Sequence, residues 1–203
     1  LSKSIGRTVG KVVIFDQSCA HLFRVNELLH LFKFKKLETV IDYLHGEAFS
    51  TLLEVIDTHH VDHFTLVADI VDKTKICPAL FLMKLASRVR SIYIYQSEVE
   101  DIVEDGYLLG VYNIDWSGVF LDMFKSKLDK LYINNAHRFL WKKSAERLFK
   151  ELPKVGKKVW FTATYERGPE GTHYRNNHTI QVCVINDQRV LKIMHDSRVN
   201  EAL

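Results

Sequence analysis

Five short segments share one arrangement of apolar residues. Two spacers separate the first apolar position from the second, and one spacer separates the second from the third. The segments are Val9–Ile14, Val61–Leu66, Val89–Ile94, Leu128–Ile133 and Gly156–Phe161, the last with glycine in the first position. Each is rich in β-branched and aromatic residues and is bounded by polar residues, which is typical of a buried strand. The spacing therefore predicts five strands, each of which points three apolar side chains toward a shared core.

Helical periodicity follows between these segments, with apolar residues at steps of three and four. Pro78 suits the first turn of one helix, and Ser117 is expected to cap another. The expected helices cover residues 21–34, 37–56, 79–85, 119–124 and 140–152. Strands that alternate with crossover helices predict an α/β fold in which most strands are parallel.

The end of the chain breaks this alternation. Three strand-like segments without intervening helices cover residues 157–165, 179–185 and 190–195. We therefore expect one domain over 1–203, with an αβ repeat region at 9–165 and an antiparallel β-hairpin cap at 166–203. Two architectures remain open for the repeat region. The three-residue apolar core favours a solenoid similar to leucine-rich repeats, whereas the uneven spacing of the segments favours an open α/β sheet with helices on both faces.

A resemblance supports the first architecture. Val61–Ile70, Val89–Gln96 and Leu128–Asn135 resemble degenerate leucine-rich-repeat units. They are more particularly similar to the αβ repeats that follow an F-box in nematode F-box-associated proteins. The resemblance covers about residues 60–165. It implies an adaptor that recruits a substrate or serves as a scaffold, without catalytic residues.

Composition is that of a globular protein and excludes disordered and collagen-like classes, with 47% hydrophobic residues, 9 Gly and 3 Pro. The net charge of +3, from 28 basic and 25 acidic residues, conceals an acidic run near 98–105 and a basic helix near 138–158. Aromatic residues in the 98–118 loop are of the types that anchor interfaces, and the basic helix could meet an acidic protein or, as an alternative, RNA. The candidate partner-binding residues are therefore Tyr107, Tyr112, Trp116, Arg138, Lys142, Lys143 and Arg147.

Two clusters carry an enzymatic alternative. His59, His60, Asp62 and His63 are residue types that bind zinc. Asp16 and Asp69 are expected at the carboxyl ends of two strands, where α/β enzymes collect a divalent cation. Either set would suit a metal-dependent hydrolase or a nuclease of the PIN type. The sequence contains no GxSxG, P-loop or GxGxxG motif, so we expect no cofactor and favour a non-enzymatic protein–protein interaction module.

The cysteines indicate the cellular compartment of the protein. There are three, Cys19, Cys77 and Cys183, and their odd number and unpaired spacing favour a reducing environment. No apolar run approaches the roughly 20 residues that span a bilayer. We therefore expect a cytoplasmic or nuclear protein without a membrane partner. The chain begins at Leu1 rather than Met, which we interpret as a sign that it is cut from a longer protein.

Overall fold

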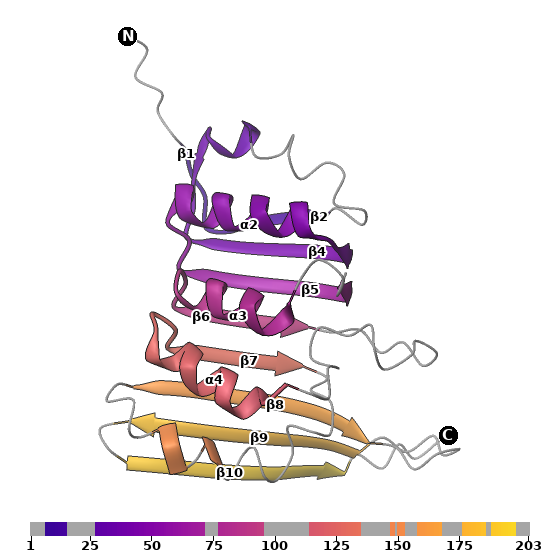
Figure 1. Cartoon of the computed structure of the whole chain (residues 1–203), viewed down its shortest axis with the longest axis vertical. Helices are drawn as coiled ribbons and strands as arrows, with labels where there is room; N and C mark the ends of the chain where they lie inside the picture. The colour runs from indigo at the N-terminus through magenta and orange to yellow at the C-terminus, as the bar shows by residue number, and fades with distance from the viewer. Residues whose placement is uncertain are drawn as a thin grey trace.

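An eight-stranded sheet dominates the computed structural model of the chain (Figure 1). The structure describes residues 7–15, 27–71, 77–95, 114–134, 147–148, 150–152, 158–167, 176–185 and 188–197. The strands of the large sheet, in chain order, are β2 (Val12–Phe15), β4 (Lys36–Leu44), β5 (His63–Val71), β6 (Ser91–Tyr95), β7 (Lys130–Asn134), β8 (Val159–Arg167), β9 (Asn176–Ile185) and β10 (Gln188–Ser197). A small separate sheet pairs β1 (Arg7–Thr8) with β3 (Phe32–Lys33).

All neighbouring strands from β2 to β8 are parallel, and β9 and β10 continue the sheet as an antiparallel hairpin. The predicted fold class, mostly parallel strands that alternate with helices and end in an antiparallel pair, is therefore confirmed. Strand order follows chain order throughout the large sheet. A doubly wound sheet would reverse its order at a switch point, whereas a solenoid adds each strand beside the last.

Three helices lie on one side of this sheet: α2 (Gly46–His59), α3 (Pro78–Ala86) and α4 (Trp116–Lys125) (Figure 1). Sequential strands with helices on one side are the geometry of a solenoid, so the structure favours that one of the two architectures. Membership of the leucine-rich-repeat family stays a prediction. The predicted helix 79–85 corresponds to α3, in which Pro78 occupies the first turn.

The core lies between the sheet and these helices. The apolar triples that the sequence singles out point into it. The three triples in the middle of the chain are almost fully buried, namely Val61, Phe64 and Leu66; Val89, Ile92 and Ile94; and Leu128, Leu131 and Ile133. Aromatic side chains fill the layer between helices and strands. The ring of Phe49 in α2 contacts that of Phe81 in α3 edge-on, with their centroids 4.7 Å apart, and the ring centroids of Phe120 in α4 and Phe161 in β8 lie 5.5 Å apart. Each repeat thus buries against its neighbours the apolar surface that it could not bury alone.

The prediction of one helix over 37–56 is wrong, because its first half is strand β4. Leu37, Thr39 and Ile41 are buried while Glu38 and Val40 are half-exposed, which is the alternation of a strand. The same residues also satisfy helical spacing through Leu37, Ile41 and Leu44, so the local pattern is ambiguous. Pairing with β2 on one side and β5 on the other decides for the strand.

Strand β4 is in fact a sixth copy of the repeat. Phe34, Leu37 and Thr39 occupy the three core positions, and all are buried. A threonine in the third position hides the copy from a search for apolar triples. Because Phe34 falls between Val9 and Val61, the additional copy also removes the longest gap between repeats.

Two further helix predictions need adjustment, and the described part of a third is confirmed. Of the predicted helix 21–34, residues 27–29 are helical, residues 21–26 lie outside the described residues, and the chain turns into β3 at Phe32. Helix α4 is capped by Asp115 rather than by Ser117, because the Asp115 carboxylate accepts the N–H of Gly118 at 3.1 Å. Of the predicted helix 140–152, the structure describes helical residues at 147, 148, 150 and 151, and the remainder of its start lies outside the described residues.

A backbone ladder connects the starts of the parallel strands. We call it the edge ladder and define it by Lys35, Asp62, Arg90 and Asp129, the residues that precede β4, β5, β6 and β7. The Lys35 carbonyl accepts the N–H groups of Asp62 and His63 at 2.9 and 3.0 Å. The Asp62 carbonyl accepts the N–H groups of Arg90 and Ser91. The Arg90 carbonyl accepts those of Asp129 and Lys130, and the Asp129 carbonyl accepts the N–H of Trp160. Each repeat is thereby locked to the next before their strands begin to pair.

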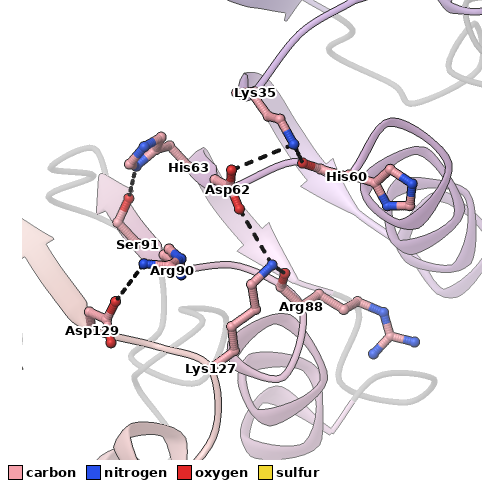
Figure 2. Close-up of polar contacts among 9 residues, drawn as sticks. All are labelled: Lys35, His60, Asp62, His63, Arg88, Arg90, Ser91, Lys127 and Asp129. Atoms are coloured by element: carbon pink, nitrogen blue, oxygen red, sulfur yellow. Dashed lines mark hydrogen bonds and ion pairs between the residues drawn. The ribbon is translucent and has the colours of Figure 1, made fainter. Parts of the chain in front are cut away.

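Side-chain charges alternate in sign along the edge ladder (Figure 2). Lys35 lies 3.6 Å from Asp62, and Arg90 lies 3.9 Å from Asp129. Lys127 adds a second cation to Asp62 at 3.4 Å. Exposed pairs of this kind each contribute at most about 1 kcal/mol, so they support a register that the backbone bonds already define.

Replacing Thr39 by valine should stabilise the protein. The Thr39 hydroxyl is fully buried and donates only a long 3.5 Å hydrogen bond to the Thr65 carbonyl. Since a poorly bonded buried hydroxyl costs about 1–3 kcal/mol, Thr39→Val should raise the free energy of unfolding in urea by about 1 kcal/mol. Thr65→Val, at a half-exposed position of the neighbouring strand, is the control and should change it little. A loss of stability in Thr39→Val would contradict the assignment of this position to the apolar triple.

Replacing His60 by glycine should also stabilise the protein. His60 ends α2 in the left-handed region (φ 52°, ψ 50°), with its N–H on the Asp57 carbonyl and the N–H of Val61 on the Ile56 carbonyl. A residue with a Cβ pays about 1 kcal/mol for this conformation, which glycine adopts freely. His60→Gly should therefore raise the urea midpoint. Thr58→Gly, two residues earlier in the regular helix, should lower the midpoint, because glycine is a few tenths of a kcal/mol less favourable than threonine inside a helix, and equal effects of the two variants would contradict the explanation.

Candidate interaction surface on the helix-free side of the sheet

The side of the parallel sheet opposite α2, α3 and α4 is the main candidate for a functional site. Side chains alternate along a strand, so residues between the buried ones point to this side. Strand register arranges them in rows that run across the sheet: Glu38, Thr65, Tyr93, Tyr132 and Thr162 form the central row. On one side of it lies the row of Lys36, His63, Ser91, Lys130 and Trp160, and on the other the row of Phe15, Val40, Val67 and Tyr95. We call these three rows the helix-free face.

Aromatic residues dominate the middle of the helix-free face. The ring centroids of Tyr93 and Tyr132 lie 5.9 Å apart, and those of Tyr95 and Tyr132 lie 5.6 Å apart. Several large side chains keep much of their surface in water: Phe15 is 77% exposed, Trp160 39% and Tyr95 36%. Contiguous apolar surface of this kind, on rigid strands, is typical of an interaction site.

Two hollows lie side by side on this face and share Tyr93. The larger, of about 440 Å³, is lined by Lys11, Glu38, Thr65, Val67, Tyr93 and Tyr95. The smaller, of about 220 Å³, is lined by Tyr93, Lys130, Leu131, Tyr132, Trp160 and Thr162. Both combine apolar walls with one or two charged groups at the rim, which is the composition of a site that seats a side chain of a partner.

Some charged side chains around the hollows form ion pairs and others do not. Glu38 forms an ion pair with Lys11 at the rim of the larger hollow. Lys36 and Lys130 are exposed, and no carboxylate forms an ion pair with either of them within the described ranges. Burial, together with the neighbouring Tyr132, Tyr93 and Glu38, raises the pKa of Tyr95, so its hydroxyl stays protonated and able to donate a hydrogen bond at neutral pH.

The edge ladder borders this face at the start of the strands. Partial burial would raise the pKa of Asp62, but the ammonium groups of Lys35 and Lys127 outweigh that effect and lower it. Asp62 is therefore ionised at neutral pH and is shared between two lysines. Arg90 remains 65% exposed and points its charge toward solvent beside Asp129.

The histidine cluster does not converge in the structure. His59 stacks on Phe34 at 4.5 Å and lies 5.7 Å from His30, and burial followed by the proximity of His30 lowers its pKa. His60 ends the helix, and His63 Nδ1 is hydrogen-bonded to the Ser91 hydroxyl at 2.5 Å (Figure 2). The side chains of His59 and His63 thus have separate structural contacts, and His60 is placed by its backbone at the end of α2. Among the described residues no three His, Cys, Asp or Glu side chains are grouped as metal ligands.

Of the two carboxylates predicted at strand ends, Asp69 belongs to the described residues. Asp69 lies inside β5, two residues before its end at Val71, so the expectation that it ends the strand is wrong. Hydrogen bonds to β4 continue the strand past it, with Ile70 paired to Tyr43. Asp16 lies outside the described residues.

Of the predicted partner-binding residues, Trp116 is placed differently from the expectation. It is 4% exposed and stacks on Phe120 at 5.9 Å, so it is a core residue rather than an exposed anchor. As the first residue of α4 it faces the sheet, because the helix begins at the Asp115 cap and lays its apolar side on the core. Tyr107, Tyr112, Arg138, Lys142 and Lys143 lie outside the described residues.

Arg147 is exposed but already engaged. Its guanidinium donates to Asp115 Oδ2 at 2.6 Å and to the Ser117 hydroxyl at 3.1 Å, which ties its helix to the start of α4. The Arg147 guanidinium, the Ser117 hydroxyl and the Gly118 N–H together lower the pKa of Asp115. A Cβ at Gly118 would lie 2.6 Å from Asp115 Oδ2, so a larger residue there would displace the carboxylate that caps α4.

The aromatic residues of the helix-free face are the functional candidates that sequence reasoning missed. A signal for them exists in the repeat itself. Thr65, Tyr93, Tyr132 and Trp160 each occupy the single spacer between the second and third apolar positions. In a strand this spacer points away from the core, so two tyrosines and a tryptophan at that position indicate an aromatic surface.

Comparisons of the chain with protein-family models, with curated proteins and with solved structures found no match. The helices that the structure describes are all too short or too polar to cross a membrane.

The Asp115–Arg147 pair should make stability depend on pH. The pKa of Asp115 is lower in the folded chain than its ordinary value, so its contribution is complete above about pH 4 and is lost as the pH falls through the folded value. Asp115→Asn keeps a capping side chain but loses the charge. The variant should be less stable than the wild type at pH 7, by less than about 1 kcal/mol because the pair is half-exposed, and the difference should close toward pH 2.

Urea unfolding at pH 7, 4 and 2 measures this difference. Arg147→Ala, which removes the main cause of the lowered pKa, is the matched variant and should show the same closing difference. A difference from the wild type that stays constant over this range in both variants would contradict the role of the pair.

Proposed function

We propose that this chain is a non-enzymatic protein–protein interaction module that binds another protein across its helix-free face. The observation that carries the proposal is the gathering of Tyr93, Tyr95, Tyr132 and Trp160 around two adjacent hollows, on the side of the strands opposite α2, α3 and α4 (Figure 1). Tyrosine and tryptophan are the residue types that dominate binding energy at protein interfaces. An adaptor or scaffold, which recruits another protein, needs a surface of this kind and no reacting groups.

The rigidity of the strands supports this proposal. Each anchor residue sits on a strand that is hydrogen-bonded to both neighbours, so the surface exists before a partner arrives. Little conformational entropy is then lost on binding, and the buried aromatic area is converted into affinity more completely. The 98–118 loop and the basic 138–158 helix stay predicted as additional contact regions. We place the module in the cytoplasm or the nucleus, as the unpaired spacing of its cysteines favours.

The enzymatic alternative has less support. The side chains of His59, Asp62 and His63 are committed to three separate contacts, with Phe34, with two lysines and with Ser91. Those contacts explain the residues as parts of the fold. The ring contacts of Tyr132 with Tyr93 and Tyr95 support the sheet, but they do not explain the exposed surface of Phe15 and Trp160 on the same face.

Photocrosslinking tests the proposal. We expect benzoylphenylalanine in place of Tyr95 to crosslink the intact chain to a specific protein in extracts, and the same group in place of Leu80 of α3 to yield no such product. Leu80 is a matched position, since it is 52% exposed but lies on the opposite side of the sheet. Crosslinks to a specific protein from position 80 alone, or from neither position, would contradict the proposal.

Affinity for the identified protein should then depend on the anchors. The double variant Tyr95→Ser with Trp160→Ser should weaken binding by about thirtyfold or more, the effect of losing about 2 kcal/mol of binding free energy. Leu80→Ser with Met83→Ser removes similarly exposed apolar surface from α3 and should leave affinity unchanged. Equal losses in the two double variants would show a general effect of surface polarity and would overturn the proposal.

A further inference from the structure

The chemistry of the helix-free face also indicates what kind of partner it takes. We infer that its occupant is an extended, acidic segment of the partner protein that crosses the strands and seats one apolar side chain in each hollow. This inference rests on the proposed function and narrows it from any protein surface to one class of peptide.

The shape of the site supports an extended segment. The two hollows follow one another across the sheet: the larger is lined by Lys11, which precedes β2, and by β4, β5 and β6, and the smaller is lined by β6, β7 and β8. Two strand spacings separate β5 from β7, which is about 10 Å. An extended chain covers that distance in three or four residues, at about 3.3 Å each. Two anchors three or four residues apart would therefore fill both hollows.

Tyr93 shapes the path between them. Its side chain lines both hollows, so a segment that enters one must pass over its ring to reach the other. Thr65, Thr162 and the tyrosine hydroxyls lie along the same row and offer hydrogen bonds to the backbone of the crossing segment. A folded partner with a broad convex surface would use these polar groups less well than an extended chain whose own backbone is free.

Charge supports an acidic segment. Lys130 lines the smaller hollow and Lys36 lies in the same row, and neither forms an ion pair within the described part of the chain. Lys35, Arg90 and Lys127 add positive charge along the adjoining edge. The one carboxylate of the three rows, Glu38, is already paired with Lys11. Acidic residues beside the anchors would meet unpaired ammonium groups, whereas basic ones would be repelled.

RNA would also find stacking surfaces and lysines here, but the observations favour a peptide. Asp62 and Asp129 stand between the cations of the edge ladder, and Glu38 lies on the face itself. A nucleic acid carries a charge at every phosphate and would bring some of them against these carboxylates. A peptide places its charges only where the lysines lie.

Selection from a random peptide library tests the inference. Twelve-residue peptides displayed on phage would be selected on the intact chain, and the enriched peptides measured by fluorescence anisotropy. We expect enrichment of peptides with two apolar residues three or four positions apart, flanked by Asp or Glu. Lys130→Glu should weaken the binding of the enriched peptide at least about tenfold. Lys84→Glu, the same charge reversal on α3, is the control and should leave it unchanged.

Charge exchange gives a readout that misfolding could not produce. A peptide whose acidic residues are replaced by lysine should bind Lys130→Glu better than it binds the wild type. Enriched peptides that are uncharged or basic, or that bind Lys130→Glu as well as the wild type, would overturn the inference. So would a single-stranded RNA of twelve nucleotides that outcompetes every enriched peptide. Because the crosslink from position 95 and the loss in Tyr95→Ser with Trp160→Ser do not depend on peptide chemistry, the proposed function could stand while this inference fails.

Discussion

The backbone ladder at the starts of the strands is the constraint on which the other features of this structure depend. The carbonyls of Lys35, Asp62 and Arg90 each accept two N–H groups from the following repeat, so the residues that precede β4, β5, β6 and β7 are tied to one another in turn. A slip of one residue would turn each strand over and send its apolar triple into water. The ladder thus keeps apolar residues on the helix side and leaves the other side free for different chemistry.

That separation explains how the sheet combines stability with the surface proposed to bind a partner. Phe64, Ile92 and Leu131 lie in one row under the helices and hold the repeats together, while Tyr93 and Tyr132 lie beside them on the opposite side. Substitutions on the helix-free face therefore change the chemistry of this surface without opening the core. The antiparallel hairpin of β9 and β10 continues the sheet beyond β8, so the last parallel strand does not present a bare edge.

Much of the fold could be predicted from the repeat, and its failures have identifiable causes. The predicted strands at 61–66, 89–94 and 128–133 correspond to β5, β6 and β7. Their apolar triples and flanking polar residues fit a strand and do not fit a helix. Strand β4 was missed because Thr39 replaces the third apolar residue and because Leu37, Ile41 and Leu44 also fit a helix. Trp116 was expected to be exposed because a tryptophan next to an acidic loop carries no local sign of which way its helix faces.

The sequence by itself determined that the apolar triples of β5, β6 and β7 enter the core, because burial of apolar surface depends on spacing within one short segment. Tertiary structure alone decided the register between segments. By its position in the repeat, Trp160 would pair with Tyr132, yet β8 is shifted by two residues and sets Trp160 opposite Lys130. That shift places an aromatic wall and an unpaired ammonium group around one hollow. Register depends on hydrogen bonds between strands that are distant in the chain, and no single segment contains that information.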